Sequence, residues 1–195
     1  RRLKSEERTI SNCTGLQTQA VFTAALNTAL RDGIIERNPM TLLTSKERFH
    51  QQESTRVYLT IDELKRMMAT PCDDGELKKA FLFACFTGLR LSDIRTFTWN
   101  KVLTTPNDST RYIRVRMLKT QQVVNVPLSK DALGYLRETE DGDEPIFRLS
   151  SAASVIEQRL AEWAKNAGIE KHVTFHVSRH SYATMMLTIG VDIYT

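Results

Sequence analysis

The sequence predicts a mainly α-helical protein with one small antiparallel β-hairpin, an α+β arrangement in which helices dominate. Two patterns carry this prediction. Most apolar side chains recur at helical spacing, in segments that end at glycine or proline. Only residues 111–128 alternate as strands do. The 195 residues suffice for one ordinary domain or one and a half, and a hydrophobic fraction of 41% suffices for a packed core.

The first third of the chain predicts one helix followed by a linker. Residues 16–31 place apolar side chains on a helical stripe, Gly33 is a stop signal, and Asn38-Pro39 prevents continuation. The polar stretch 44–55 has little periodicity. We interpret 46–55 as a linker between two domains, 1–45 and 56–195; the alternative is a surface loop inside one domain.

The next segment predicts three helices. Thr60 and Glu63 form a capping-box pattern that opens a helix over 61–69, and Pro71 and residues 73–75 end it. Residues 76–86 are apolar over a wide face, which predicts a buried helix that Gly88 ends. Ser92 is predicted to cap a short helix over 93–99.

The remaining chain predicts the hairpin and three more helices. Residues 111–118 and 123–128 form its two strands, with Lys119 in the connection. Ser129 starts a helix, and the acidic stretch 138–145 is a loop. A helix over 151–166 is closed by Gly168, and the last runs from near His176 to Gly190 with an apolar stripe, which comprises Tyr182, Ala183, Met186, Leu187 and Ile189.

Composition narrows the function classes only loosely. A formal net charge of +4 is compatible with a nucleic-acid partner but also with many metabolic enzymes. The three cysteines are odd in number and lack CxxC spacing, which favours reduced thiols over a disulfide framework or zinc site. No secretory signal and no run of roughly 18 apolar residues is present, so we expect a cytoplasmic protein without a membrane partner.

Four basic residues have the side-chain types and sequence positions expected of a site that binds a phosphodiester. Arg90 lies between two predicted helices, and Lys119 lies at the hairpin turn. His176 and Arg179 are one helical turn apart and share a face. Arginine forks bind phosphate oxygens, a lysine on a turn can protonate a leaving oxygen, and a histidine can share a proton near neutral pH.

Each of these residues also has a simpler explanation. Arg90 fits a structural ion pair, Lys119 a solvated charge, His176 a helix cap, and Arg179 a partner of Asp192 or of an acidic loop residue. No acidic triad that would hold Mg²⁺ or Mn²⁺ is apparent, so we expect no metal and no other cofactor.

The order of three motifs resembles the tyrosine recombinase (phage integrase) family. These are "TGLRLSDI", the hairpin lysine in "LKTQQVVNVPL", and "HVSRHSYATMMLTIGVDIYT", whose H-x-x-R-H-[ST]-[FY]-A box matches almost fully. The segments "GLRLSDI" and "GVDIYT" are similar to those of integrases of mobile elements in Bacteroides-like bacteria. The resemblance covers 56–195 as an incomplete catalytic domain, and 1–45 resembles the last helices of the helical core-binding domain that precedes it.

The resemblance implies a role for each matching residue. Arg90 and Arg179 would be the phosphate-clamping arginines, Lys119 the general acid toward the 5′-oxygen, and His176 the histidine of the second box. Asp93 stands where much of the family has glutamate and would orient Arg90 or its neighbours. Preorganised cations around a phosphorane would supply most of the catalysis.

The family's Leu-Gly-His box and nucleophilic tyrosine have no match in this sequence. Tyr194 precedes the position of that box, Tyr182 is expected in the core, and no other tyrosine matches. We therefore expect these 195 residues to bind DNA but not to cut it.

The resemblance implies a recombinase that cleaves and rejoins a double-stranded DNA site through a 3′-phosphotyrosyl intermediate, as a homo-tetramer, with accessory DNA-bending proteins as further partners. Integration or excision of a mobile element is the expected setting. A non-catalytic DNA-binding module is the main alternative, and a type IB topoisomerase is a more distant one.

Overall fold

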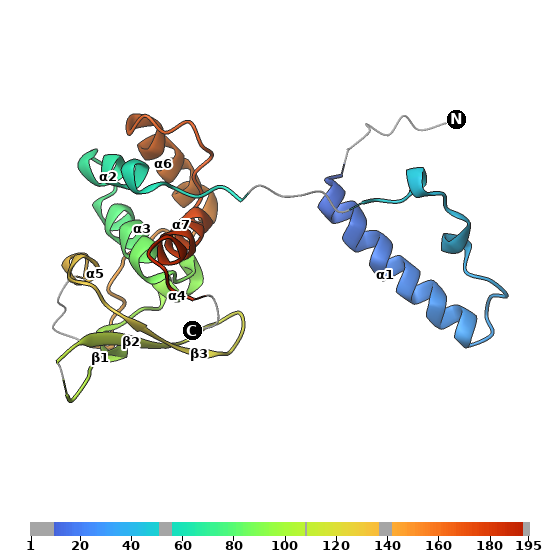
Figure 1. Ribbon diagram of the computed structural model, residues 1–195, viewed down its shortest axis with the longest axis horizontal. Helices are drawn as coiled ribbons and strands as arrows, with labels where there is room; N and C mark the ends of the chain where they lie inside the picture. The colour runs from blue at the N-terminus through green and yellow to red at the C-terminus, as the bar shows by residue number, and fades with distance from the viewer. Residues whose placement is uncertain (1–9, 51–55, 108, 137–141, 193–195) are drawn as a thin grey trace. The chain divides into compact units, whose positions relative to one another are not determined.

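The computed structural model describes residues 10–50, 56–107, 109–136 and 142–192 (Figure 1). The chain divides into two compact units, Arg1–Thr55 and Arg56–Thr195. This division lies at the end of the predicted linker.

The first unit consists of one long helix and two short 3-10 turns. Helix α1 spans Asn12–Arg31 and begins four residues before the predicted start, because Ser11 caps it by accepting a hydrogen bond from Thr14. The turns η1 (Pro39–Leu42) and η2 (Ser45–Glu47) follow. Phe49, inside the predicted linker, lies over Gly15 and donates its backbone N–H to Gln19. The start of the predicted linker therefore packs on α1.

The second unit is built around helix α3, which spans Gly75–Thr87. Residues 80–85 are all buried, as the wide apolar face predicts. Phe81 packs edge-on against Trp163 and Phe175, with ring centroids 5.9 and 5.7 Å away. Helix α2 (Ile61–Ala69) begins with the predicted capping box of Thr60 and Glu63.

The short helix after α3 corrects one prediction. Helix α4 spans Leu91–Arg95 with Arg90 at its N-cap, so Ser92 lies inside the helix and does not cap it. The predicted continuation to residue 99 is also wrong, because the chain leaves the helix at Thr96 and Thr98 forms an isolated β-bridge with Pro145. The turn η3 (Trp99–Lys101) follows.

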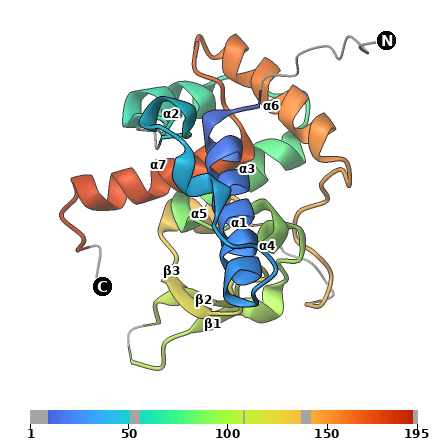
Figure 2. The same cartoon turned by 90° about the vertical axis from the view of Figure 1, so that its right-hand side faces the viewer.

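The predicted hairpin is confirmed and gains a third strand. Strands β1 (Val102–Thr104), β2 (Arg111–Arg116) and β3 (Val123–Pro127) form an antiparallel sheet in the order β1-β2-β3. The short β1 carries no alternation long enough to predict. The helices of this unit lie on one side of the sheet (Figures 1 and 2). Within the part of the chain described, the mainly helical fold with a small antiparallel sheet is the predicted one.

Three more helices complete the second unit: α5 (Lys130–Gly134), α6 (Ala153–Asn166) and α7 (Phe175–Thr188). Ser129 caps α5 as predicted. In α7 the apolar stripe is not the buried face. Its buried residues are Phe175, Val177, Ser178 and Ser181, whereas Leu187 and Ile189 stay 52% and 67% exposed. The first turns of α7 hold it to the core, and its later turns present apolar side chains outward.

Candidate active site

Four predicted site residues line one pocket of about 350 Å³ beyond the C-terminal end of α3. They come from three segments far apart in the sequence: Arg90 before α4, Lys119 in the β2–β3 turn, and His176 and Arg179 on α7. The other lining residues are Leu89, Leu91, Ser92, Glu157, Thr174 and Phe175. Four basic residues face one acidic residue, so the pocket suits an anion.

Gly88 joins the end of α3 to this pocket. Its φ of +68° is a left-handed conformation that favours glycine, and a Cβ there would lie 2.5 Å from the ring of Tyr182. Arg179 donates a hydrogen bond of 2.6 Å from Nη1 to the Gly88 carbonyl. This bond fixes α7 against the turn that leads into Arg90.

The first turn of α7 adds further positive character. His176 and Arg179 lie three residues apart, so both project from the same side of the helix. Thr174 precedes the helix without a side-chain capping hydrogen bond, and it lines the pocket. Free backbone N–H groups and the helix dipole at such an end favour a bound anion.

Asp93 connects α4 to the hairpin that carries Lys119. It is 1% exposed, and its Oδ1 accepts a 2.9 Å hydrogen bond from the backbone N–H of Leu118. Its Oδ2 is buried without a hydrogen-bond partner among the described groups. The resemblance implies that Asp93 orients Arg90 or its neighbours. In the structure its hydrogen bond goes to Leu118, the neighbour of Lys119, and Lys119 is the general acid that the resemblance implies.

The site cations shift one another's protonation. The pKa of His176 lies below its ordinary 6.5. Burial is the largest cause, followed by electrostatic repulsion from His180, Arg179, Arg90 and Lys119. Burial and Arg90 lower the pKa of Arg179. His176 is therefore neutral at pH 7 in the unbound protein, and a phosphate entering the pocket would relieve the repulsion among the cations.

Two further residues of α7, His180 and Ser181, support the site. The rings of His176 and His180 meet edge-on with centroids 4.7 Å apart. Ser181 accepts a hydrogen bond of 2.8 Å from the backbone N–H of Leu59 and donates one to Val177. Ser181 thereby ties the start of the second unit to the helix that bears His176. Its partner is 122 positions away, so no local pattern could reveal it.

None of the four described tyrosines lines the pocket. Tyr182 packs on Gly88 and borders a neighbouring apolar pocket of about 400 Å³, which Arg90 and Arg179 also touch. Tyr135 stacks on Phe86. Tyr194 lies outside the described residues.

Among the described residues, no cluster of three or more histidine, cysteine, aspartate or glutamate side chains could hold a metal ion. In the same ranges no helix is long and apolar enough to cross a membrane.

Sequence comparison places this geometry in a family. Residues 57–195 match the phage integrase family. A tyrosine recombinase of Thermosipho africanus is 29% identical over 171 residues, which are 83% of this chain and 57% of that protein. Tyrosine recombinase XerC of Neisseria meningitidis serogroup B is 32% identical over 157 residues, 73% of this chain and 51% of its own length. The chain thus spans about half the length of these curated relatives.

Solved structures share the fold. XerA recombinase matches with a TM-score of 0.55 at 26% identity, over 73% of this chain and 55% of that one. A lambda integrase dimer bound to a COC′ core site matches with a TM-score of 0.69 at 21% identity, over 94% and 67% of the two chains. The Tn1549 transposon integrase in complex with circular intermediate DNA gives 0.67 at 18% identity, over 96% and 70%. With the family match over residues 57–195, these likenesses show that the chain belongs to the phage integrase family of tyrosine recombinases.

Proposed function

We propose that this chain is the part of a site-specific DNA recombinase that holds the scissile phosphate. The observation that carries the proposal is the meeting of Arg90, Lys119, His176 and Arg179 at one pocket whose described lining contains one acidic residue, Glu157. A structural ion pair or a solvated surface charge does not account for four basic residues gathered from three segments. A phosphodiester does, because its charge grows toward the transition state.

The proposed chemistry is transesterification by a tyrosine hydroxyl. The tyrosine oxygen attacks phosphorus as its proton passes to neutral His176, the bond from phosphorus to the 5′-oxygen breaks, and Lys119 gives its proton to that oxygen. Arg90 and Arg179 clamp the non-bridging oxygens, and His176, once protonated, donates to them. The 3′-phosphotyrosyl bond conserves the phosphodiester energy, so the reverse attack rejoins a strand without metal or ATP.

The partners follow from this chemistry. The proposed substrate is a double-stranded recombination site. A protein that acts on such a site is expected in the cytoplasm, associated with the nucleoid. A lambda integrase tetramer bound to a Holliday junction has a similar fold, with a TM-score of 0.64. This likeness supports a homo-tetramer on DNA; accessory bending proteins remain a prediction. We also propose that the first unit is the end of a core-binding domain and helps to hold the duplex.

Covalent trapping on nicked duplex DNA tests the reaction, with the protein as its gene encodes it. Lys119→Ala should slow attachment strongly on normal DNA, because the leaving 5′-oxygen then lacks a proton donor. On a substrate with sulfur at that position the loss should shrink, since a thiolate leaves without a proton. An equal loss on both substrates would remove the general-acid role.

A second candidate, DNA binding without cleavage, draws on the absence of every described tyrosine from the pocket. The same trapping assay on the 195-residue chain separates the two. Tight binding without attachment supports the binding module for these residues, and attachment would show that a tyrosine of this chain, Tyr194 included, is the nucleophile.

A further inference from the structure

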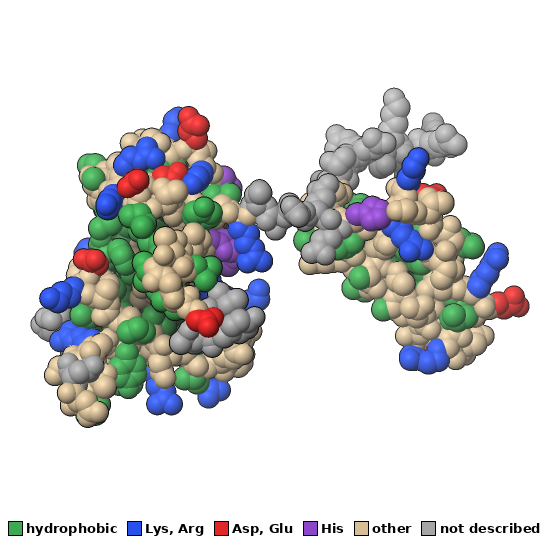
Figure 3. Space-filling model, viewed as in Figure 1, with side chains coloured by type: hydrophobic (Ala, Val, Ile, Leu, Met, Phe, Trp, Pro, Cys, Tyr) green, Lys and Arg blue, Asp and Glu red, His purple; other side chains and the backbone are tan. Residues whose placement is uncertain are grey.

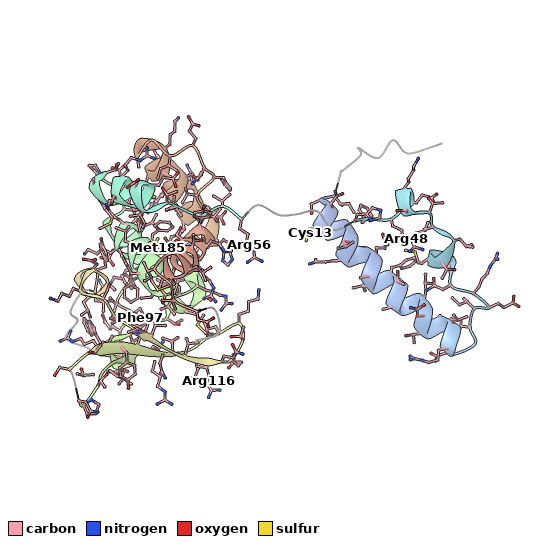
Figure 4. All side chains as sticks on the ribbon, viewed as in Figure 1. Cys13, Arg48, Arg56, Phe97, Arg116 and Met185 are labelled. Carbon is pink, nitrogen blue, oxygen red and sulfur yellow. The ribbon has the colours of Figure 1, made fainter. Side chains whose placement is uncertain are left out.

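The outer face of the sheet carries an arginine row that the proposed site does not use. Along β2, Ile113 and Val115 are buried, and Arg114 and Arg116 are exposed on the opposite face. Figure 4 labels Arg116 on the side of the sheet away from the helices, and Figure 3 shows blue side chains along that side of the second unit. The fold directs these two guanidinium groups into solvent.

The described strands place no acidic side chain beside these arginines. The strands Val102–Thr104, Arg111–Arg116 and Val123–Pro127 contain no aspartate or glutamate. Arg114 lies opposite Asn125, and Arg116 lies opposite Val123. Neither arginine forms a salt bridge within the described ranges. Two unpaired positive charges beside each other cost repulsion unless an anion binds between or along them.

The row leads into the pocket. Arg114 and Arg116 lie two residues apart on one strand face, about 6.7 Å along the strand, and the same hairpin turns at Lys119, which lines the pocket with Arg90 and Arg179. Arg114, Arg116 and Lys119 thus lie on one hairpin, and the last of them lines the site of the proposed scissile phosphate. Arginine suits such a series because its planar fork binds phosphate oxygens.

We propose that the outer face of the sheet, through Arg114 and Arg116, binds phosphates of the duplex that flank the one held in the pocket. The contact is electrostatic and independent of base sequence. It rests on the proposed function, which supplies the duplex. The row's continuity with Lys119 favours DNA over an acidic protein surface, which is the competing partner.

The salt dependence of DNA binding by the 195-residue chain tests this contact. A short fluorescent duplex of mixed sequence is titrated at several salt concentrations with the parent chain and with the double variant Arg114→Ala, Arg116→Ala. Each lost phosphate contact should reduce the slope of log K against log salt by about 0.9. We expect a slope shallower by roughly 1.8 and an affinity loss of about 5- to 20-fold.

A matched control removes the same charge elsewhere. Lys79→Ala with Arg148→Ala deletes two exposed cations at the other end of α3, each with an acidic neighbour, Glu76 and Glu144. This variant should keep the parent slope and stay within about 2-fold in affinity. Circular dichroism and thermal melting of both variants show that any loss does not come from unfolding.

The outcomes separate the two proposals. If the double variant Arg114→Ala, Arg116→Ala keeps the parent chain's slope of log K against log salt, the sheet contact is overturned and the pocket proposal stands. An acidic protein is then the remaining partner for this face. DNA binding that depends on Arg114 and Arg116 supports the sheet contact, whereas covalent attachment that persists at near-parent yield in Arg179→Ala contradicts the pocket, so the two proposals can fail separately. A parent chain that does not bind duplex DNA overturns both.

Discussion

The two ends of helix α3 each open onto a charged pocket, and the pockets differ in how their charges are balanced. At the N-terminal end a pocket of about 870 Å³ mixes four acidic and three basic side chains, which are Asp73, Asp74, Glu76, Glu162, Lys79, Arg148 and Arg159. Asp74 and Arg159 form a 2.5 Å salt bridge there. At the C-terminal end a pocket of about 350 Å³ gathers Arg90, Lys119, His176 and Arg179 around Glu157.

The difference shows why the smaller pocket is the functional candidate. At the N-terminal end charges of both signs are mixed, and the salt bridges Asp74–Arg159 and Glu76–Lys79 offset most of them, which leaves a surplus of one negative charge. At the C-terminal end like charges lie together, which costs stability unless an anion enters. Imbalance of charge, rather than pocket volume, marks the site.

Arg179→Ala should have the largest effect and tests the C-terminal end directly. In the protein as its gene encodes it, we expect covalent DNA attachment to slow by about 10²- to 10³-fold, as for loss of one preorganised donor to a developing anion. Equilibrium DNA binding should fall much less. Covalent trapping and fluorescence anisotropy on the same duplex measure the two.

Arg159→Ala is its matched control at the N-terminal end. It removes an arginine whose charge is already paired with Asp74, so attachment should stay near the parent rate. Attachment by Arg179→Ala at near-parent yield would remove that residue from the clamp.

Gly88→Ala should have the next largest effect, because Gly88 shapes the turn between α3 and Arg90. A side chain there meets both an unfavourable φ of +68° and the Tyr182 ring at 2.5 Å. We expect about 2–4 kcal/mol of lost stability in urea unfolding. Gly168→Ala, at the same φ but with its nearest neighbour, the flexible Arg66, 3.5 Å away, should cost about 1–2 kcal/mol. Equal costs would show that the Tyr182 contact adds nothing.

The sequence predicted those features of the fold and site that depend on interactions between residues close together in the chain. The capping box of Thr60, the buried helix α3 and the hairpin follow from short patterns, and the structure confirms all three. The motif order also selected four residues that the fold brings to one pocket.

What the sequence did not predict depends on tertiary contacts. Serine suits a cap position, which predicts Ser92 as the cap, but in the structure Arg90 is the cap and the helix starts at Leu91, two residues before the predicted Asp93. The bond from Leu118 to Asp93 spans 25 positions, and the bond from Leu59 to Ser181 spans 122. The narrower likeness to Bacteroides-type integrases and the catalytic roles themselves remain predictions.

Asp74→Ala should have a smaller effect, confined to the N-terminal end. Asp74 caps α3 by accepting the backbone N–H of Leu77 and pairs with Arg159. We expect about 1–2 kcal/mol of lost stability, mainly from the cap. DNA affinity should stay within about 2-fold after correction for folded fraction. A larger loss of DNA affinity in the folded protein would mean that this end also contacts DNA.

The pH dependence of DNA affinity should show the smallest effect. The pKa values of His176 and His180 are lowered, first by burial and then by cations such as Arg179. In the unbound protein these imidazoles are therefore neutral where unfolded ones begin to protonate, so acidification below the ordinary 6.5 should lower the melting temperature. A bound phosphate has the opposite effect on His176: its negative charge raises the pKa of the imidazole, so binding is accompanied by uptake of a proton.

DNA affinity should accordingly rise about 2- to 5-fold from about pH 7.5 to about 5.5. His176→Asn should flatten this rise, whereas His172→Asn should leave it, because His172 does not line the pocket. Anisotropy titrations at constant ionic strength separate the proton effect from salt. A rise that persists in His176→Asn would assign the proton to His180 or another group and place the phosphate farther from His176 than the pocket geometry implies.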